Sequence, residues 1–190
     1  MSFFAFALPD SVGLTLGNGA DELLQMLTTA VAQPDAVVLA PEPTFVMYRL
    51  YALHSRIRYV GVPLRADLSF DVEAMLAAIA RERPALIWLP YPNNPTGTLT
   101  SREDVARLLA EVPDDVLLVM HEAYIDFLTD AADLLPQHRH AMPQHLLLPP
   151  TFSNTFALAG PRLGYGLRPP GPIAPPDTVP HPATLHSFPR

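Results

Sequence analysis

Cysteine and lysine are both absent from the sequence of 190 residues. Without cysteine the chain can form no disulfide bridge, no thiolate metal site and no cysteine nucleophile. The twelve basic residues are all arginines, so no side chain carries the primary amine that covalent catalysis at a carbonyl group uses. Any chemistry of this chain must therefore proceed without a nucleophilic lysine.

Charged residues are scarce. They make up 16 % of the chain, compared with about 25 % in typical soluble domains, and the formal net charge is −7. The arginines are scattered, so no basic surface is available for a phosphate backbone and we expect no nucleic-acid binding. The low charge indicates a surface that is either poorer in charge than usual or partly covered by a missing region or another subunit.

Long apolar runs are absent as well. No segment approaches the roughly 18 apolar residues that a membrane-spanning helix requires. The apolar start, MSFFAFALPD, lacks the positive charge and the cleavage site of a signal peptide. Together with the lack of cysteine, these features predict a cytoplasmic protein that has no membrane partner.

The remaining pattern alternates apolar strands with amphipathic helices. Apolar runs predict strands at 36–40, 56–62, 84–91 and 116–120, and helical periodicity predicts helices at 20–32, 44–54, 71–82 and 100–112. Thr100 and Glu103 have the spacing of a capping box for the last helix. The alternation is typical of a three-layer α/β fold with a mostly parallel sheet, in which ligands bind beyond the carboxyl ends of the strands.

The last part of the chain has a different composition. Eight prolines lie within residues 169–190, and no helix or central strand tolerates that density of proline. We therefore expect one domain over residues 1–168 and a disordered or extended tail over 169–190. An extended proline-rich tail is also compatible with a docking segment for another protein.

Polar motifs follow several of the predicted elements. They are GNGADE at 17–22, PTF at 43–45, YPNNPTG at 91–97, HEAY at 121–124 and FSNTFALAGPRLGYG at 152–166. GNGADE would present free backbone amides to a phosphate at the start of a helix. Each motif taken alone is also explained by helix capping or by turn chemistry.

The order of the motifs carries more information than any one of them. The series resembles the fold-type I pyridoxal-phosphate aminotransferases, and most closely the histidinol-phosphate aminotransferases, over residues 14–168. The resemblance implies the large domain of that fold, pyridoxal phosphate as cofactor, an amino-acid or amino-phosphate substrate and a homodimer. The family also has an N-terminal segment and a small domain that have no counterpart here, so we expect a truncated chain.

The resemblance implies a phosphate site built from two parts of the chain. The backbone amides of Gly19, Ala20 and Asp21 match the segment that holds the cofactor phosphate. Ser153 and Arg162 match the remaining phosphate ligands, and an arginine suits a phosphate because its guanidinium forms charge-assisted, bidentate hydrogen bonds.

The resemblance also implies a ring site, in which two positions depart from the family. Phe45 matches the aromatic residue that stacks on the pyridine ring, and Asn94 and Tyr124 match the pair that bonds the phenolic oxygen. Asn154 stands where the family has the lysine that bonds the cofactor covalently, and His121 stands where it has the aspartate that pairs with the pyridine nitrogen. An amide is no nucleophile, and a neutral imidazole does not offset a pyridinium charge.

These departures leave three interpretations open. The chain is a working aminotransferase, an inactive subunit that binds pyridoxal phosphate noncovalently, or a degenerate fragment without function. The first requires covalent capture, a proton shuttle and a clamp for the substrate carboxylate, and the groups that usually supply them are replaced or missing. We therefore predict strongly impaired catalysis.

We expect no metal site. HEAY begins like a zinc-protease motif, but Ile125 stands where the second histidine ligand would follow His121. A second group of histidines, formed by His138, His140 and His145, lies in a polar segment and lacks an accompanying carboxylate or cysteine pattern.

Overall fold

The structure is a computed structural model that describes residues 13–125, 146–147 and 163–168. Along the chain the elements are β1 (Gly13–Asn18), α1 (Ala20–Ala30), β2 (Val37–Glu42), α2 (Met47–His54), β3 (Arg58–Pro63), α3 (Val72–Glu82), β4 (Leu86–Pro90), α4 (Arg102–Glu111), β5 (Leu117–His121), β6 (Leu146–Leu147) and β7 (Leu163–Arg168). The predicted strands and helices are confirmed to within a few residues. The proline-rich tail lies outside the described residues.

Among the described residues the main sheet has five strands in the order β3-β2-β4-β5-β6, and every pair in it is parallel. In the register of β4 and β5, Pro90 lies opposite His121. A separate two-stranded sheet joins β1 to β7 in antiparallel pairing, from Gly13 opposite Arg168 to Asn18 opposite Leu163. The predicted α/β fold with a mostly parallel sheet is confirmed.

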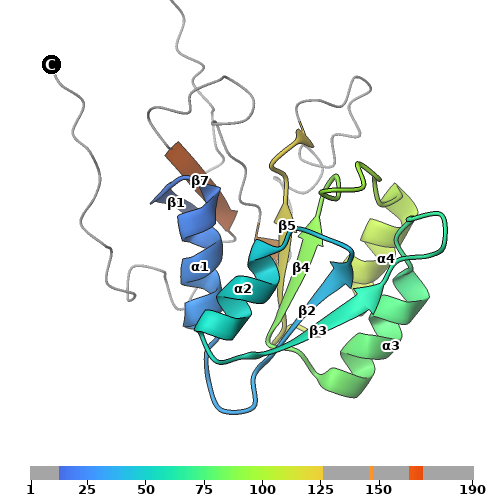
Figure 1. Ribbon diagram of the computed structural model, residues 1–190, viewed down its shortest axis with the longest axis horizontal. Helices are drawn as coiled ribbons and strands as arrows, with labels where there is room; N and C mark the ends of the chain where they lie inside the picture. The colour runs from blue at the N-terminus through green and yellow to red at the C-terminus, as the bar shows by residue number, and fades with distance from the viewer. Residues whose placement is uncertain (1–12, 126–145, 148–162, 169–190) are drawn as a thin grey trace, which may run out of the picture.

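Helices cover both faces of the main sheet, with α1 and α2 on one side and α3 and α4 on the other (Figure 1). Successive side chains of a strand point to opposite faces, and the two cores follow this alternation. Val38, Leu86, Trp88 and Val119 pack with α1 and α2. The core under α3 and α4 contains Leu39, Ile87, Leu89, Leu118 and Met120. Both faces are therefore buried, which explains why the strands read as continuous apolar runs.

Two of the helices begin at capping side chains. Asp71 Oδ1 accepts a hydrogen bond from the Ala74 amide at 3.1 Å and starts α3. Ser101 Oγ accepts one from the Asp104 amide at 3.0 Å and starts α4. The expectation that Thr100 caps α4 is wrong, because Thr100 is buried and the cap lies one residue later. Among the described residues no helix is long and apolar enough to cross a membrane.

We expect the core below α4 to dominate stability. Leu108 is fully buried, whereas Leu53 on α2 is 61 % exposed. Leu108→Ala should lower the free energy of unfolding by about 2–5 kcal/mol, and the matched Leu53→Ala should change it by less than about 0.5 kcal/mol. Chemical denaturation followed by circular dichroism measures both, and equal effects would contradict the placement of α4.

Candidate functional site

The carboxyl ends of β2, β4 and β5 bring three loops to one edge of the sheet. Because the strands are parallel neighbours, the loops at 43–46, 91–99 and 122–125 all leave from the same edge. The Tyr91 amide donates a hydrogen bond to the His121 carbonyl at 2.9 Å, so the second and third loops begin side by side. This is the edge at which open α/β sheets bind their ligands.

Asn93 ties two of these loops together. Its Oδ1 accepts a hydrogen bond from Thr44 Oγ1 at 2.8 Å, and its Nδ2 donates to the Pro43 carbonyl at 3.0 Å and to Thr96 Oγ1 at 2.8 Å. The side chain is buried and its amide is satisfied on both sides. Asn93 therefore positions the segment that carries Phe45. The sequence did not reveal this role, because the motif YPNNPTG contains two adjacent asparagines and does not show which one faces the neighbouring loop.

Asn94 differs from its neighbour. It is half-buried, and the structure assigns its side chain no hydrogen bond to another described residue. Tyr124, three residues after the end of β5, is 37 % exposed. The structure therefore places both predicted partners of the phenolic oxygen on loops at the ligand edge of the sheet.

His121 ends β5 on the face that α1 and α2 cover, two residues after Val119. Its Nδ1 lies 2.8 Å from the hydroxyl of Tyr48, and its Nε2 is buried without a hydrogen-bond partner among the described residues. Burial lowers the pKa of His121 to about 4, because an apolar environment disfavours the charged imidazolium. The imidazole is therefore neutral at physiological pH.

Aromatic rings surround this histidine. The Phe45 ring lies 6.1 Å from the imidazole and 5.5 Å from the Tyr48 ring, and Tyr48 stacks on Trp88 at 5.0 Å with an interplanar angle of 7°. Burial, with smaller contributions from the charges of Tyr59 and Asp21, raises the pKa of Tyr48 well above its usual value. The Tyr48 hydroxyl is consequently a neutral group that keeps its proton.

The start of α1 lies near the same face. Gly19 has a left-handed φ of 82° and precedes α1, and no side chain caps the first turn. A Cβ on Gly17 would lie 2.8 Å from Leu23 Cγ, so glycine is required for the close packing of β1 on α1. The Asp21 carboxylate contributes, after burial, to raising the pKa of Tyr51 to about 12, which places the start of α1 beside α2.

The other predicted site residues are not described. Ser153, Asn154 and Arg162 lie outside the described residues, as do the histidines at 138, 140 and 145. Within the described part of the chain, no group of three or more metal-ligating side chains comes together. Glu122 is a buried acidic residue next to His121, and the sequence analysis assigned it no role.

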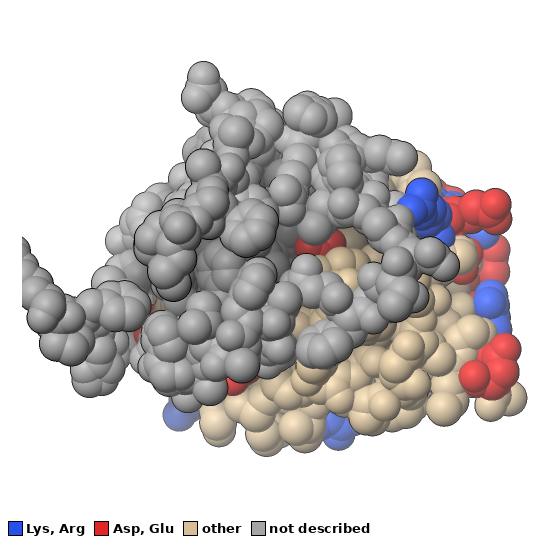
Figure 2. Space-filling view, turned by 90° about the horizontal axis from the view of Figure 1, so that it is seen from above, with Lys and Arg blue, Asp and Glu red and all other residues tan. Residues whose placement is uncertain are grey.

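A view onto the carboxyl ends of the strands shows where the charges lie. In Figure 2 many of the visible acidic and basic side chains gather along one margin, on the side of α3 and α4, and others are visible near the centre and along the lower border. The ion pairs Arg107–Glu73, Arg107–Glu111 and Arg65–Asp71 belong to α3, α4 and their adjoining segments. A further ion pair joins Arg49 of α2, the residue after Tyr48, to Glu42 of β2, so charged side chains also lie on the side of α2.

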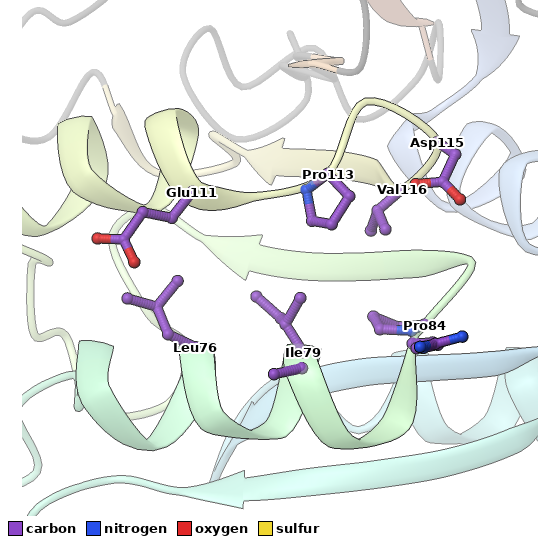
Figure 3. A pocket seen from close by; sticks show the side chains of 9 residues that line it. Leu76, Ile79, Pro84, Glu111, Pro113, Asp115 and Val116 are labelled. Atoms are coloured by element: carbon purple, nitrogen blue, oxygen red, sulfur yellow. The ribbon is translucent and has the colours of Figure 1, made fainter.

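A cavity of about 430 Å³ lies at the opposite end of the sheet. Figure 3 shows Leu76 and Ile79 of α3 pointing into it, facing Pro113 and Val116. Val116 immediately precedes β5, so the cavity adjoins the amino ends of the strands. It is therefore remote from the edge where the three loops meet.

The sequence matches the family model of aminotransferase class I and II over residues 4–171. The chain belongs to this family. It is 48 % identical over 162 residues to a histidinol-phosphate aminotransferase of Chromobacterium violaceum, covering 85 % of this chain and 43 % of that protein. It is 50 % identical over 158 residues to histidinol-phosphate aminotransferase 2 of Burkholderia pseudomallei, covering 83 % and 43 %.

A solved structure supports the same family. The histidinol-phosphate aminotransferase of Sinorhizobium meliloti in complex with pyridoxal-5'-phosphate matches with a TM-score of 0.75 and 31 % identity, covering 82 % of this chain and 42 % of that one. The large-domain fold and pyridoxal phosphate as the cofactor of the family are thereby confirmed. The chain spans less than half the length of these aminotransferase relatives.

We expect the two neighbouring asparagines to differ in their effect on stability. Asn93→Ala removes three hydrogen bonds of a buried side chain and should lower the free energy of unfolding by about 2–3 kcal/mol, because each hydrogen bond contributes about 1 kcal/mol. Asn94→Ala should change it by less than about 0.5 kcal/mol. Thermal and denaturant unfolding of both variants test this, and the reverse order would refute the assignment of Asn93 as the loop tie.

We also expect His121 to make stability depend on pH. Its pKa falls from 6.5 to about 4 on folding, so between these values the unfolded chain binds more protons than the folded chain. The contribution of the neutral His121 to the free energy of unfolding is fully present above about pH 7. It decreases by up to about 3 kcal/mol as the pH falls toward 4. Denaturation between pH 4 and 8 should show a steeper loss for the wild type than for His121→Gln, and parallel curves would contradict a buried neutral imidazole.

Proposed function

We propose that this chain is a histidinol-phosphate aminotransferase-like domain that binds pyridoxal phosphate noncovalently and is severely impaired in transamination. The observation that carries the proposal is the buried, neutral His121, whose Nε2 has no partner among the described residues and whose ring lies beside Phe45. An unsatisfied buried polar atom at the ligand edge of the sheet suits a group that arrives with the cofactor. The sequence, meanwhile, offers no lysine to bind that cofactor covalently.

The ring side of the site retains groups that fit a pyridine ring. Phe45 is half-buried and held by the Asn93 tie, so its aromatic face is available for stacking. Asn94 and Tyr124 lie on the two loops beside it and offer an amide and a phenol to the phenolic oxygen of the cofactor. His121 would face the ring nitrogen.

The phosphate side rests on the start of α1. The first-turn amides at Ala20 and Asp21 have no side-chain cap, and amides at a helix start bind phosphate through hydrogen bonds and the helix dipole. We assign Ser153 and Arg162 as the further phosphate ligands, on the strength of their places in the FSNTFALAGPRLGYG motif.

The chemical groups that the family uses for turnover are altered. When bound, pyridoxal phosphate supplies an electron-withdrawing ring that stabilises negative charge on the substrate. Asn154 can accept or donate a hydrogen bond but can neither bond the cofactor covalently nor move a proton. The neutral imidazole of His121 adds no negative charge beside the ring nitrogen, so the electron withdrawal is weakened as well.

The wider assignments follow the same proposal. We assign residues 1–168 to the core of the pyridoxal-phosphate domain and 169–190 to a separate tail. A homodimer and an amino-acid or amino-phosphate substrate belong to this proposal through the family resemblance, and a cytoplasmic location through the composition of the sequence. The proposal includes no metal ion, and the described residues contain no group of three or more metal-ligating side chains.

The decisive experiment is a titration of the purified chain with pyridoxal phosphate, followed by visible absorption and by mass spectrometry after borohydride treatment. The wild type should bind the cofactor and retain none of it covalently. Asn154→Lys should gain a borohydride-stable bond, because it restores the missing amine. Asn154→Arg is the matched control, since it adds the charge without a nucleophilic amine and should gain no such bond.

Two outcomes would refute the proposal. If the wild type transaminates at rates typical of aminotransferases, the predicted impairment is wrong. If the wild type and both variants unfold cooperatively but bind no pyridoxal phosphate, the cofactor assignment is wrong. A chain that shows no cooperative unfolding would instead support the degenerate-fragment interpretation.

A further inference from the structure

The hydroxyl of Tyr48 and the imidazole of His121 form an isolated buried pair. Tyr48 has no exposed surface, and within the described part of the chain its hydroxyl makes a single hydrogen bond, to His121 Nδ1 at 2.8 Å. The stacked ring of Trp88 holds the phenol in place. The positions of the protons in this pair therefore decide whether Nε2 of His121 is a hydrogen-bond donor or an acceptor.

Two arrangements of the protons are possible in a neutral pair. If the phenol donates to Nδ1, the imidazole proton resides on Nε2, and the Nε2–H group is the one polar group of this pair without a partner among the described residues. If Nδ1–H donates to the phenol, the phenolic proton and the Nε2 lone pair are both left without a described partner. Because each unsatisfied buried polar group costs free energy, the first arrangement is favoured.

We propose that His121 Nε2–H donates a hydrogen bond to the pyridine nitrogen of pyridoxal phosphate, so that this site holds that nitrogen in its unprotonated state. The inference rests on the proposed function and specifies the electronic form of the cofactor in it. A carboxylate accepts a hydrogen bond from a pyridinium N–H group, whereas an N–H donor requires a nitrogen lone pair. In this contact the protein is therefore the hydrogen-bond donor and the ring nitrogen the acceptor, whereas an aspartate would be the acceptor.

The surroundings of His121 fit this assignment. The Phe45 ring, which the family motif assigns to the face of the pyridine, lies 6.1 Å from the imidazole at an interplanar angle of 48°. Burial is the cause of the lowered pKa of His121, and Asp21, at the start of the neighbouring helix, is exposed. The imidazole thus faces the ring nitrogen as a neutral group, and Tyr48, which stacks on Trp88, holds it in place.

The direct test is nuclear magnetic resonance of the full chain with pyridoxal phosphate labelled with ¹⁵N in the ring. Phosphorus resonance of the same sample reports binding independently. The wild-type complex should show the ring-nitrogen signal of an unprotonated pyridine and a His121 imidazole that carries its proton on Nε2. His121→Asp should move the ring-nitrogen signal far upfield, because the carboxylate stabilises a protonated nitrogen.

Tyr48→Phe tests the role of the phenol as a positioning residue. Without the phenolic donor, His121 should populate both neutral tautomers, and the affinity for pyridoxal phosphate should fall by about two- to tenfold, the worth of one hydrogen bond. Tyr51→Phe is the matched control. Tyr51 lies on the same helix and is also buried, but the structure assigns it no contact with His121, so its removal should leave the tautomer unchanged.

The outcomes separate this inference from the proposed function. If phosphorus resonance shows no binding by the wild type, both are overturned. If the cofactor binds and its ring nitrogen is protonated in the wild type, noncovalent binding stands and this inference is overturned. An unprotonated nitrogen in the wild type that stays unprotonated in a folded, cofactor-bound His121→Asp would also overturn it, because His121 would then not determine the protonation state.

Discussion

The burial of both faces of the parallel sheet is the constraint on which the rest of the structure depends. Because successive side chains of a strand point to opposite faces, Val119 packs with α1 and α2, and Leu118 and Met120 pack with α3 and α4. His121 follows Val119 by two residues and shares its face. A polar side chain at that position is enclosed by aromatic and aliphatic groups and must find its partner among them.

Tyr48 is that partner, and it makes a histidine at position 121 compatible with the fold. A carboxylate buried at this point would need a compensating positive charge, which in the family the cofactor ring supplies. A neutral histidine and a neutral tyrosine need only their hydrogen bond. In the proposed assignment, a histidine at this position preserves the packing of the sheet and removes the negative charge that would strengthen electron withdrawal by the ring.

Fold and chemistry are separable in this chain. The large-domain fold of an aminotransferase is stabilised by local structural features. They are the hydrogen bonds of Asn93 between two loops, the helix caps at Asp71 and Ser101, and the close packing at Gly17. In the proposed assignment, the departures fall instead on positions 121 and 154, which the resemblance matches to the catalytic positions of the family. A fold assignment by itself therefore does not establish activity, which depends on a few groups at the site.

The sequence by itself determined the element order and the family, because strand runs, helical periodicity and ordered motifs are local signals. It did not distinguish Asn93 from Asn94 as the loop tie, and it placed the cap of α4 one residue early. Only the tertiary structure decided that Tyr48 pairs with His121, 73 residues away, and that β1 pairs with β7. These contacts depend on which faces and edges the folded chain brings together, and residues distant in sequence carry no local pattern that reveals their contact.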